Sequence, residues 1–164
     1  MEDVIPIARY EFSYIDDPFL RPALVIYCCG CPHNCSDCQN KELQSITSEF
    51  CTQVHVKDIC KIVKRTEMIE SVVYLGGDFG VYLPQYLIIS EVAKQRGLYN
   101  ILYTGFKFEE IDKKFLKYTD VVIDGKYIKK LKQDKFPASK NQKVWLRQKG
   151  IWAVIDPITL PINQ

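Results

Sequence analysis

The sequence predicts an α/β fold in the form of an open partial (β/α) barrel followed by a C-terminal β-hairpin. Short β-branched apolar runs alternate with segments whose apolar residues recur at helical spacing, which is typical of parallel sheets with right-handed crossovers. A closed barrel of eight such units needs about 250 residues, whereas 164 residues supply about five units of roughly 30 residues each. The last two apolar runs flank a short turn instead of a helix.

The first strand of the barrel is expected at about residues 23–28, where the chain is continuously apolar. Residues 1–20 are mixed and aromatic and end in a turn-like acidic segment with a proline, so we expect a short leader strand and a turn there. Between residues 54 and 65, apolar side chains fall on one helical face and lysines on the other, which predicts a helix after the first strand.

The later units repeat this alternation. β-Branched runs predict strands at residues 71–75, 100–104 and 120–123, and helical spacing predicts helices at residues 83–95 and 108–117. The carboxyl ends of parallel strands meet at one edge of a sheet, where we expect ligands to bind.

The C-terminal part of the chain follows a different pattern. Residues 143–147 and 151–155 are apolar runs separated by a turn that contains Gly150, which predicts a hairpin. With 47% hydrophobic residues and no internal repeat, we expect residues 1–164 to form a single domain around one core.

Charge and targeting signals exclude several classes of function. Lys and Arg (22) nearly balance Asp and Glu (20), and a formal charge of +2 predicts no strong field, so nucleic acid binding is not favoured. The N-terminus lacks a basic region followed by an apolar stretch, and no apolar run approaches the roughly 18 residues of a membrane span. We therefore expect a cytoplasmic protein that does not enter a membrane.

A loop after the first strand contains Cys31, Cys35 and Cys38 in C-x3-C-x2-C spacing, which brings three thiolates to one point. Disulfides are disfavoured in a reducing cytosol, and the chain has an odd number of cysteines (7), so ligation of a metal explains these residues better. Three protein ligands on a 4Fe-4S cluster leave the fourth iron with an open position, which is typical of a catalytic metal site. The hypothesis is a catalytic 4Fe-4S cluster.

Alternative readings of the cysteines remain open. A zinc site closed by Cys28, Cys29 or His33 is less favoured, because no second pair of ligands follows downstream, and a thiol redox role is favoured least. Cys28 and Cys29 end an apolar strand and are expected in the core instead of on the metal. His33 is not expected to be a ligand, and Cys51 and Cys60 are expected to be structural.

Gly76-Gly77-Asp78 follows the second barrel strand, beside the cysteine loop. Two glycines after a strand are commonly only a turn, but at this edge they let backbone carbonyls approach a ligand, and Asp78 could accept a hydrogen bond from an ammonium group. A ligand role is favoured. Asp124-Gly125, by contrast, is expected to be an ordinary turn and Lys126, with the lysines after it, a solvated face; a place in a partner contact or cofactor pocket is the alternative.

The cysteine loop, Gly76-Gly77-Asp78 and the segments at residues 103–111 and 120–127 together resemble the activating enzymes of anaerobic (class III) ribonucleotide reductases. These enzymes form a small family in the radical S-adenosylmethionine (radical SAM) superfamily, and the match spans roughly residues 20–130. The resemblance implies the open partial barrel of the radical SAM type.

It also implies a cofactor arrangement and a reaction. Cys31, Cys35 and Cys38 would hold a 4Fe-4S cluster whose fourth iron binds S-adenosylmethionine. An electron from reduced flavodoxin or ferredoxin would cleave this cofactor to methionine and a 5′-deoxyadenosyl radical, which takes a hydrogen atom from a glycine of the large reductase. The matching positions for the cofactor are Asp37, Cys38 and Gln39 near the adenine, and Gly76, Gly77 and Asp78 at the methionyl amine.

Two rival functions remain. One is activation of another glycyl radical enzyme, or modification of a peptide, by the same radical chemistry. The other is an iron–sulfur or zinc module for binding or electron transfer, in which Cys28 or Cys29 supplies a fourth ligand and no S-adenosylmethionine binds. Relatives commonly have proline after the Gly-Gly-Asp segment, where this chain has Phe79.

Overall fold

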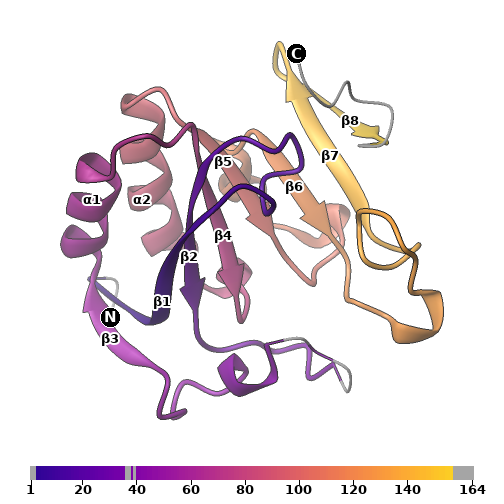
Figure 1. The fold of residues 1–164 in the computed structure, drawn as a ribbon, viewed down its shortest axis with the longest axis horizontal. Helices are drawn as coiled ribbons and strands as arrows, with labels where there is room; N and C mark the ends of the chain where they lie inside the picture. The colour runs from indigo at the N-terminus through magenta and orange to yellow at the C-terminus, as the bar shows by residue number, and fades with distance from the viewer. Residues whose placement is uncertain (1–2, 36–37, 39, 157–164) are drawn as a thin grey trace.

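The computed structural model describes residues 3–35, 38 and 40–156 (Figure 1). Among these residues, eight strands form one sheet in the order β3-β1-β2-β4-β5-β6-β7-β8. The strands are β1 (Val4–Ser13), β2 (Ala23–Cys28), β3 (Thr52–His55), β4 (Ser71–Gly76), β5 (Tyr99–Tyr103), β6 (Val121–Asp124), β7 (Lys143–Gln148) and β8 (Ile151–Ile155). The α-helices are α1 (Val56–Arg65) and α2 (Leu83–Gln95). Short 3-10 turns are η1 (Lys41–Leu43), η2 (Phe79–Val81), η3 (Phe108–Glu110), η4 (Lys113–Leu116) and η5 (Lys129–Leu131).

The sheet has a parallel centre and antiparallel flanks. β2, β4, β5 and β6 pair in parallel, while β1 and β3 on one side and β7 and β8 on the other pair antiparallel. The sheet does not close, which confirms the predicted α/β class and the open barrel. The predicted hairpin is confirmed too: Lys149 and Gly150, with φ of 50° and 78°, form a tight turn of the kind that suits the twist of two antiparallel strands.

Two local predictions are wrong. The helix expected at residues 108–117 is replaced by η3 and η4, because the Asp112 carboxylate accepts a hydrogen bond from the backbone N–H of Lys114 and so begins a new turn. The helix expected from residue 54 begins at Val56, because residues 52–55 pair with the outer edge of β1 as a strand. This strand forms by pairing with β1, a distant part of the chain. Its four residues are too few to show a strand or helix pattern in the sequence.

The core lies on both faces of the sheet, because successive residues of each strand point to opposite sides. Ile26 and Tyr74 are fully buried on the face that α1 and α2 cover, on the left in Figure 1, and Val25 and Val73 are fully buried on the other face. The two helices contain 10 and 13 residues. In the part of the chain that the structure describes, no helix is both long and apolar enough to cross a membrane.

The parallel pairing of β2 with β4 positions the site. Cys28, the last residue of β2, lies opposite Gly76, the last residue of β4. The cysteine loop and the Gly-Gly-Asp segment therefore leave the sheet side by side at its lower edge in Figure 1.

Candidate metal centre and cofactor cavity

Cys31, Cys35 and Cys38 are free, half-buried cysteines that line one cavity of about 420 Å³, and Gly76 and Gly77 line the same cavity. Burial raises the pKa of the Cys31 thiol, and the nearby Cys38 and Cys35 thiols raise it further, while a hydrogen bond from the His33 backbone lowers it. Three thiols that repel one another as thiolates suit a bound cation, because the cation offsets their charge. The structure thus brings together the three predicted metal ligands and two of the predicted cofactor residues.

The cysteine loop is held in place by backbone contacts with the segment around η1. Gly30 N–H donates to the Leu43 carbonyl at 2.8 Å and Cys31 N–H donates to the Gln44 carbonyl at 3.0 Å. The Gln44 side-chain amide donates to the Cys35 carbonyl at 3.3 Å. These hydrogen bonds fix the start and the middle of the cysteine loop. They therefore contribute to the positions of the candidate cluster ligands Cys31 and Cys35.

Glycine is required at positions 76 and 77 because the backbone there lies very close to the backbone of Cys28 and Gly30. A Cβ atom on Gly76 would lie 2.3 Å from the Cys28 carbonyl oxygen, and one on Gly77 would lie 2.3 Å from the Gly30 carbonyl oxygen. The Gly77 N–H donates to the Cys28 carbonyl oxygen at 2.8 Å, and the Asp78 N–H donates to the Gly30 carbonyl oxygen at 2.9 Å. The two glycines therefore join the Gly-Gly-Asp segment to the cysteine loop, in addition to lining the cavity.

The Asp78 carboxylate is 1% exposed and accepts four hydrogen bonds. Oδ1 accepts from Gly80 N–H at 2.7 Å; Oδ2 accepts from His33 Nε2 at 2.6 Å, Thr104 Oγ1 at 3.0 Å and Gly105 N–H at 2.9 Å. A carboxylate has about two lone-pair sites on each oxygen, so the three donors leave no free site on Oδ2, whereas Oδ1 retains one. An ammonium group could bind this carboxylate at Oδ1, or at Oδ2 by displacing one of its donors.

His33 connects the cysteine loop to the Gly-Gly-Asp segment. Its ring, only 6% exposed, donates to Asp78 and packs edge-on against Phe106 with ring centroids 4.5 Å apart. A Cβ atom on Gly105 would lie 2.4 Å from this ring, so the glycine makes room for it. Sequence reasoning set His33 aside and assigned no role to Thr104 or Gly105; the available signal was a histidine placed between two metal ligands.

Four further cysteines lie outside the metal loop. Cys29 and Cys51 form a disulfide, so the expectation that disulfides are disfavoured is wrong for this pair. Cys29 follows the end of β2 and Cys51 precedes the start of β3, and these strand ends flank β1 where Ile7 pairs with Cys28 on one side and Thr52 on the other. Cys28 and Cys60 are buried free thiols whose pKa burial raises, in agreement with a core role.

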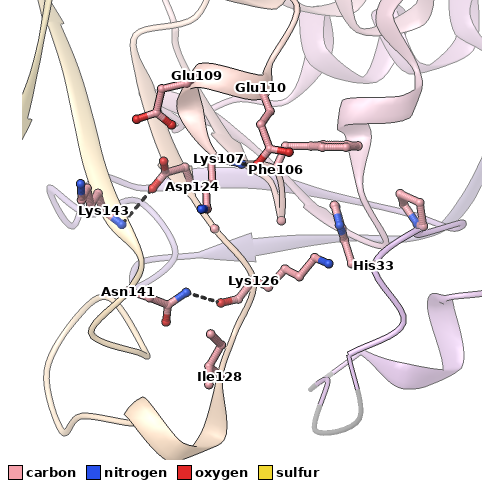
Figure 2. A pocket seen from close by; sticks show the side chains of 13 residues that line it. His33, Phe106, Lys107, Glu109, Glu110, Asp124, Lys126, Ile128, Asn141 and Lys143 are labelled. Carbon is pink, nitrogen blue, oxygen red and sulfur yellow. Dashed lines mark hydrogen bonds between the residues drawn. The ribbon is translucent and has the colours of Figure 1, made fainter.

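A second cavity of about 790 Å³ adjoins the first and shares His33, Gly105 and Lys126 with it (Figure 2). Its wall includes Asp124, whose carboxylate accepts from Phe108 N–H at 2.8 Å and from Lys143 N–H at 3.0 Å. Asp124 therefore ties η3 to β7, which is more than the ordinary turn that was expected. Figure 2 shows the Lys126 side chain pointing toward His33 across the cavity.

The donor set fits a 4Fe-4S cluster with one open iron. Three free thiols line one cavity, and among the described cysteines the nearest alternatives are unsuitable as a fourth ligand: Cys29 is in a disulfide and Cys28 is fully buried. The expected adenine-site residues Asp37 and Gln39 lie outside the described residues.

Comparisons with known proteins agree with this geometry. Residues 20–145 match a family model described as a 4Fe-4S single cluster domain. The chain is 30% identical over 153 residues to the anaerobic ribonucleoside-triphosphate reductase-activating protein of Enterobacteria phage T4, a match that covers 87% of this chain and 94% of the phage protein.

The fold is similar to that of QueE from Escherichia coli, with a TM-score of 0.53 and 16% identity over 71% of this chain and 69% of that chain. At this level of identity the similarity concerns the fold. The phage relative and the family model each cover well over half of the chain. The chain belongs to the family of anaerobic ribonucleoside-triphosphate reductase-activating proteins, and the family model that it matches is that of a domain with a single 4Fe-4S cluster.

Proposed function

We propose that this protein installs a glycyl radical on an anaerobic ribonucleotide reductase, with Cys31, Cys35 and Cys38 holding the cluster. The observation that carries the proposal is that three free thiols and the two glycines Gly76 and Gly77 line one cavity. When bound, the reduced cluster would donate one electron to S-adenosylmethionine, whose sulfur–C5′ bond would break to give methionine and a 5′-deoxyadenosyl radical; this radical would take a hydrogen atom from the reductase glycine and leave as 5′-deoxyadenosine.

The protein's own residues bind and orient the cofactor. The methionyl group would lie along Gly76-Gly77, because both glycines line the cavity that contains the three cysteines. Asp78, held by four donors, would fix the shape of this segment and would bind the methionyl amine through Oδ1 or by exchange with one of the donors to Oδ2. Asp37, Cys38 and Gln39 would bind near the adenine.

The reductase is proposed as the protein substrate and a reduced flavodoxin or ferredoxin as the electron donor, with the reaction taking place in the cytoplasm. The phage relative is named for activation of the reductase, which supports that partner over other glycyl radical enzymes. A cavity with an open side also suits a macromolecular substrate, because the partner can cover it.

Anaerobic reconstitution tests the proposal. The protein with iron and sulfide should bind about four irons per chain, form 5′-deoxyadenosine with dithionite and S-adenosylmethionine, and generate a glycyl radical signal in electron paramagnetic resonance when the reductase is added. A bound zinc, or a cluster that does not cleave S-adenosylmethionine, would instead indicate a binding or electron-transfer module. Cleavage without a reductase radical would indicate another partner.

A further inference from the structure

The connection between β6 and β7 concentrates positive charge. Residues 125–142 contain six lysines and one acidic residue, Asp134, which leaves 16 basic and 19 acidic residues in the rest of the chain. We call residues 125–142 the lysine arch; its lysines, all exposed, are Lys126, Lys129, Lys130, Lys132, Lys135 and Lys140. The formal charge of +2 therefore hides a strongly uneven distribution, and the expectation of no strong field does not hold at this surface.

The lysine arch is folded on itself. Lys140 N–H donates to the Leu131 carbonyl at 2.9 Å and Gln133 N–H donates to the Ala138 carbonyl at 3.1 Å, so the two halves of the arch pair with each other. The Asn141 amide donates to the Lys126 carbonyl at 2.8 Å and the Gln142 amide donates to the Gly125 carbonyl at 3.1 Å, which ties its base. The lysines are thus presented from an ordered backbone, which lowers the entropic cost of binding a partner.

The lysine arch also forms part of the rim of the cofactor cavity. Phe136, Pro137 and Ala138 line the cavity that contains the three cysteines, and Lys126 lines both that cavity and the larger one beside it. In Figure 1 the arch, in orange, extends from the same edge of the sheet as the cysteine loop. A macromolecule that inserts a segment into the cavity must therefore approach the arch.

Apolar side chains lie between and opposite the lysines. On the arch, Ile128 is 40% exposed and Leu131 is 38% exposed. Across the cavity, Ile15 of the β1–β2 connection lines the opening and is 78% exposed. Exposed apolar residues within a charged rim are typical of protein–protein contacts.

We propose that the lysine arch is a docking surface for an acidic patch on the reductase, located beside the glycine that is to be oxidised. This inference rests on the proposed function. The glycine must enter the cavity to meet the radical, so the surface around it must contact the rim, whereas an electron donor can deliver an electron without entering. Complementary charge steers the approach and sets the orientation of the partner.

Charge reversal on the arch tests this proposal. Lys132→Glu with Lys135→Glu changes two exposed residues that line neither of the cavities described above. Lys57→Glu with Lys64→Glu changes two exposed lysines of α1 and is a control with the same change in net charge. The dissociation constant for the reductase is measured with the cluster-loaded protein at low and high ionic strength.

The arch variant should bind the reductase on the order of tenfold more weakly at low ionic strength, while the α1 variant binds like the wild type. Salt should weaken wild-type binding and have less effect on the arch variant, because screening acts on the charges that the variant has lost. Equal affinities for the arch and α1 variants would overturn the proposal.

Two assays separate the possible partners and functions. With dithionite and no reductase, all three proteins should form 5′-deoxyadenosine at the same rate; a wild type that forms none would refute the proposed function without reference to the arch. With the reductase present, the arch variant should give less glycyl radical whether dithionite or a protein donor supplies the electron. A defect that disappears with dithionite would assign the arch to the electron donor and overturn the proposal.

Discussion

The imidazole of His33 donates to the carboxylate of Asp78 at 2.6 Å, which links the cysteine loop to the Gly-Gly-Asp segment through two buried side chains. The two residues are 45 positions apart in the sequence. The loop carries the three candidate cluster ligands, and the segment carries candidate cofactor residues. This hydrogen bond therefore helps to fix the position of the cluster ligands relative to the cofactor residues.

Replacement of His33 by alanine should destabilise the protein and weaken cofactor binding. The change removes one of four donors to a buried carboxylate, which costs about 1–3 kcal/mol in the free energy of unfolding. His33→Gln keeps an N–H donor and should recover part of the loss. Urea unfolding and the KM for S-adenosylmethionine are the measurements; equal unfolding midpoints for wild type and His33→Ala would show that the link is unimportant.

Gly77→Ala should displace the cysteine loop. The new Cβ would lie 2.3 Å from the Gly30 carbonyl oxygen, so backbone must move, at a cost of about 1–3 kcal/mol typical of overpacking. The expected result is a lower iron content after reconstitution as well as a lower melting temperature. Gly97→Ala is the control: Gly97 has a φ of +80° with open space around it, so alanine there strains the backbone far from the cysteine loop and should leave iron content unchanged.

Cys35→Ala should abolish cluster binding and formation of 5′-deoxyadenosine together, because a cluster with two protein ligands is not retained. Much of the fold should persist, since Cys35 is half-buried and lies in a loop. Iron analysis and circular dichroism measure the two effects. Cys60→Ala, which changes a buried free cysteine in α1, should keep its iron; full iron content in Cys35→Ala would contradict the ligand assignment.

The disulfide between Cys29 and Cys51 should stabilise the apoprotein. It joins residues separated by 22 positions, and closing a loop of that size is worth about 3 kcal/mol in the chain-entropy account. Reduction should lower the unfolding midpoint of the wild type, while Cys51→Ser should have the lower midpoint with or without reductant. Alkylation followed by mass spectrometry provides the check: labelling of Cys29 and Cys51 in the unreduced protein would rule the bond out.

Short-range patterns were sufficient for the central elements of the fold. The strands at β2, β4, β5 and β6, the helix α2 and the hairpin of β7 and β8 lie within a residue or two of their predicted positions. Each carries a local signal: continuous β-branched runs for buried parallel strands, helical spacing with a terminal glycine, or a glycine turn between two apolar runs. The C-x3-C-x2-C spacing is also a local signal, and it predicts the candidate cluster site.

Other features depended on contacts between distant segments. β3 forms because the outer edge of β1 is open to it, and Cys29 meets Cys51 because the end of β2 and the start of β3, which they adjoin, flank β1. The hydrogen bonds of Asp78 with His33, Thr104 and Gly105 bring together residues from three loops. No local period encodes such a meeting, because it depends on where the sheet places the ends of its strands.

The order of residues along the chain by itself determined the ligand chemistry and the alternation of strands and helices, because thiol spacing and apolar periodicity are local properties. Only the folded sheet decided that His33 binds Asp78, that Gly77 touches Gly30, and that the lysine arch borders the cofactor cavity. The physical reason is that parallel pairing carries strand ends from distant parts of the sequence to one edge, where packing and hydrogen bonding select the contacts.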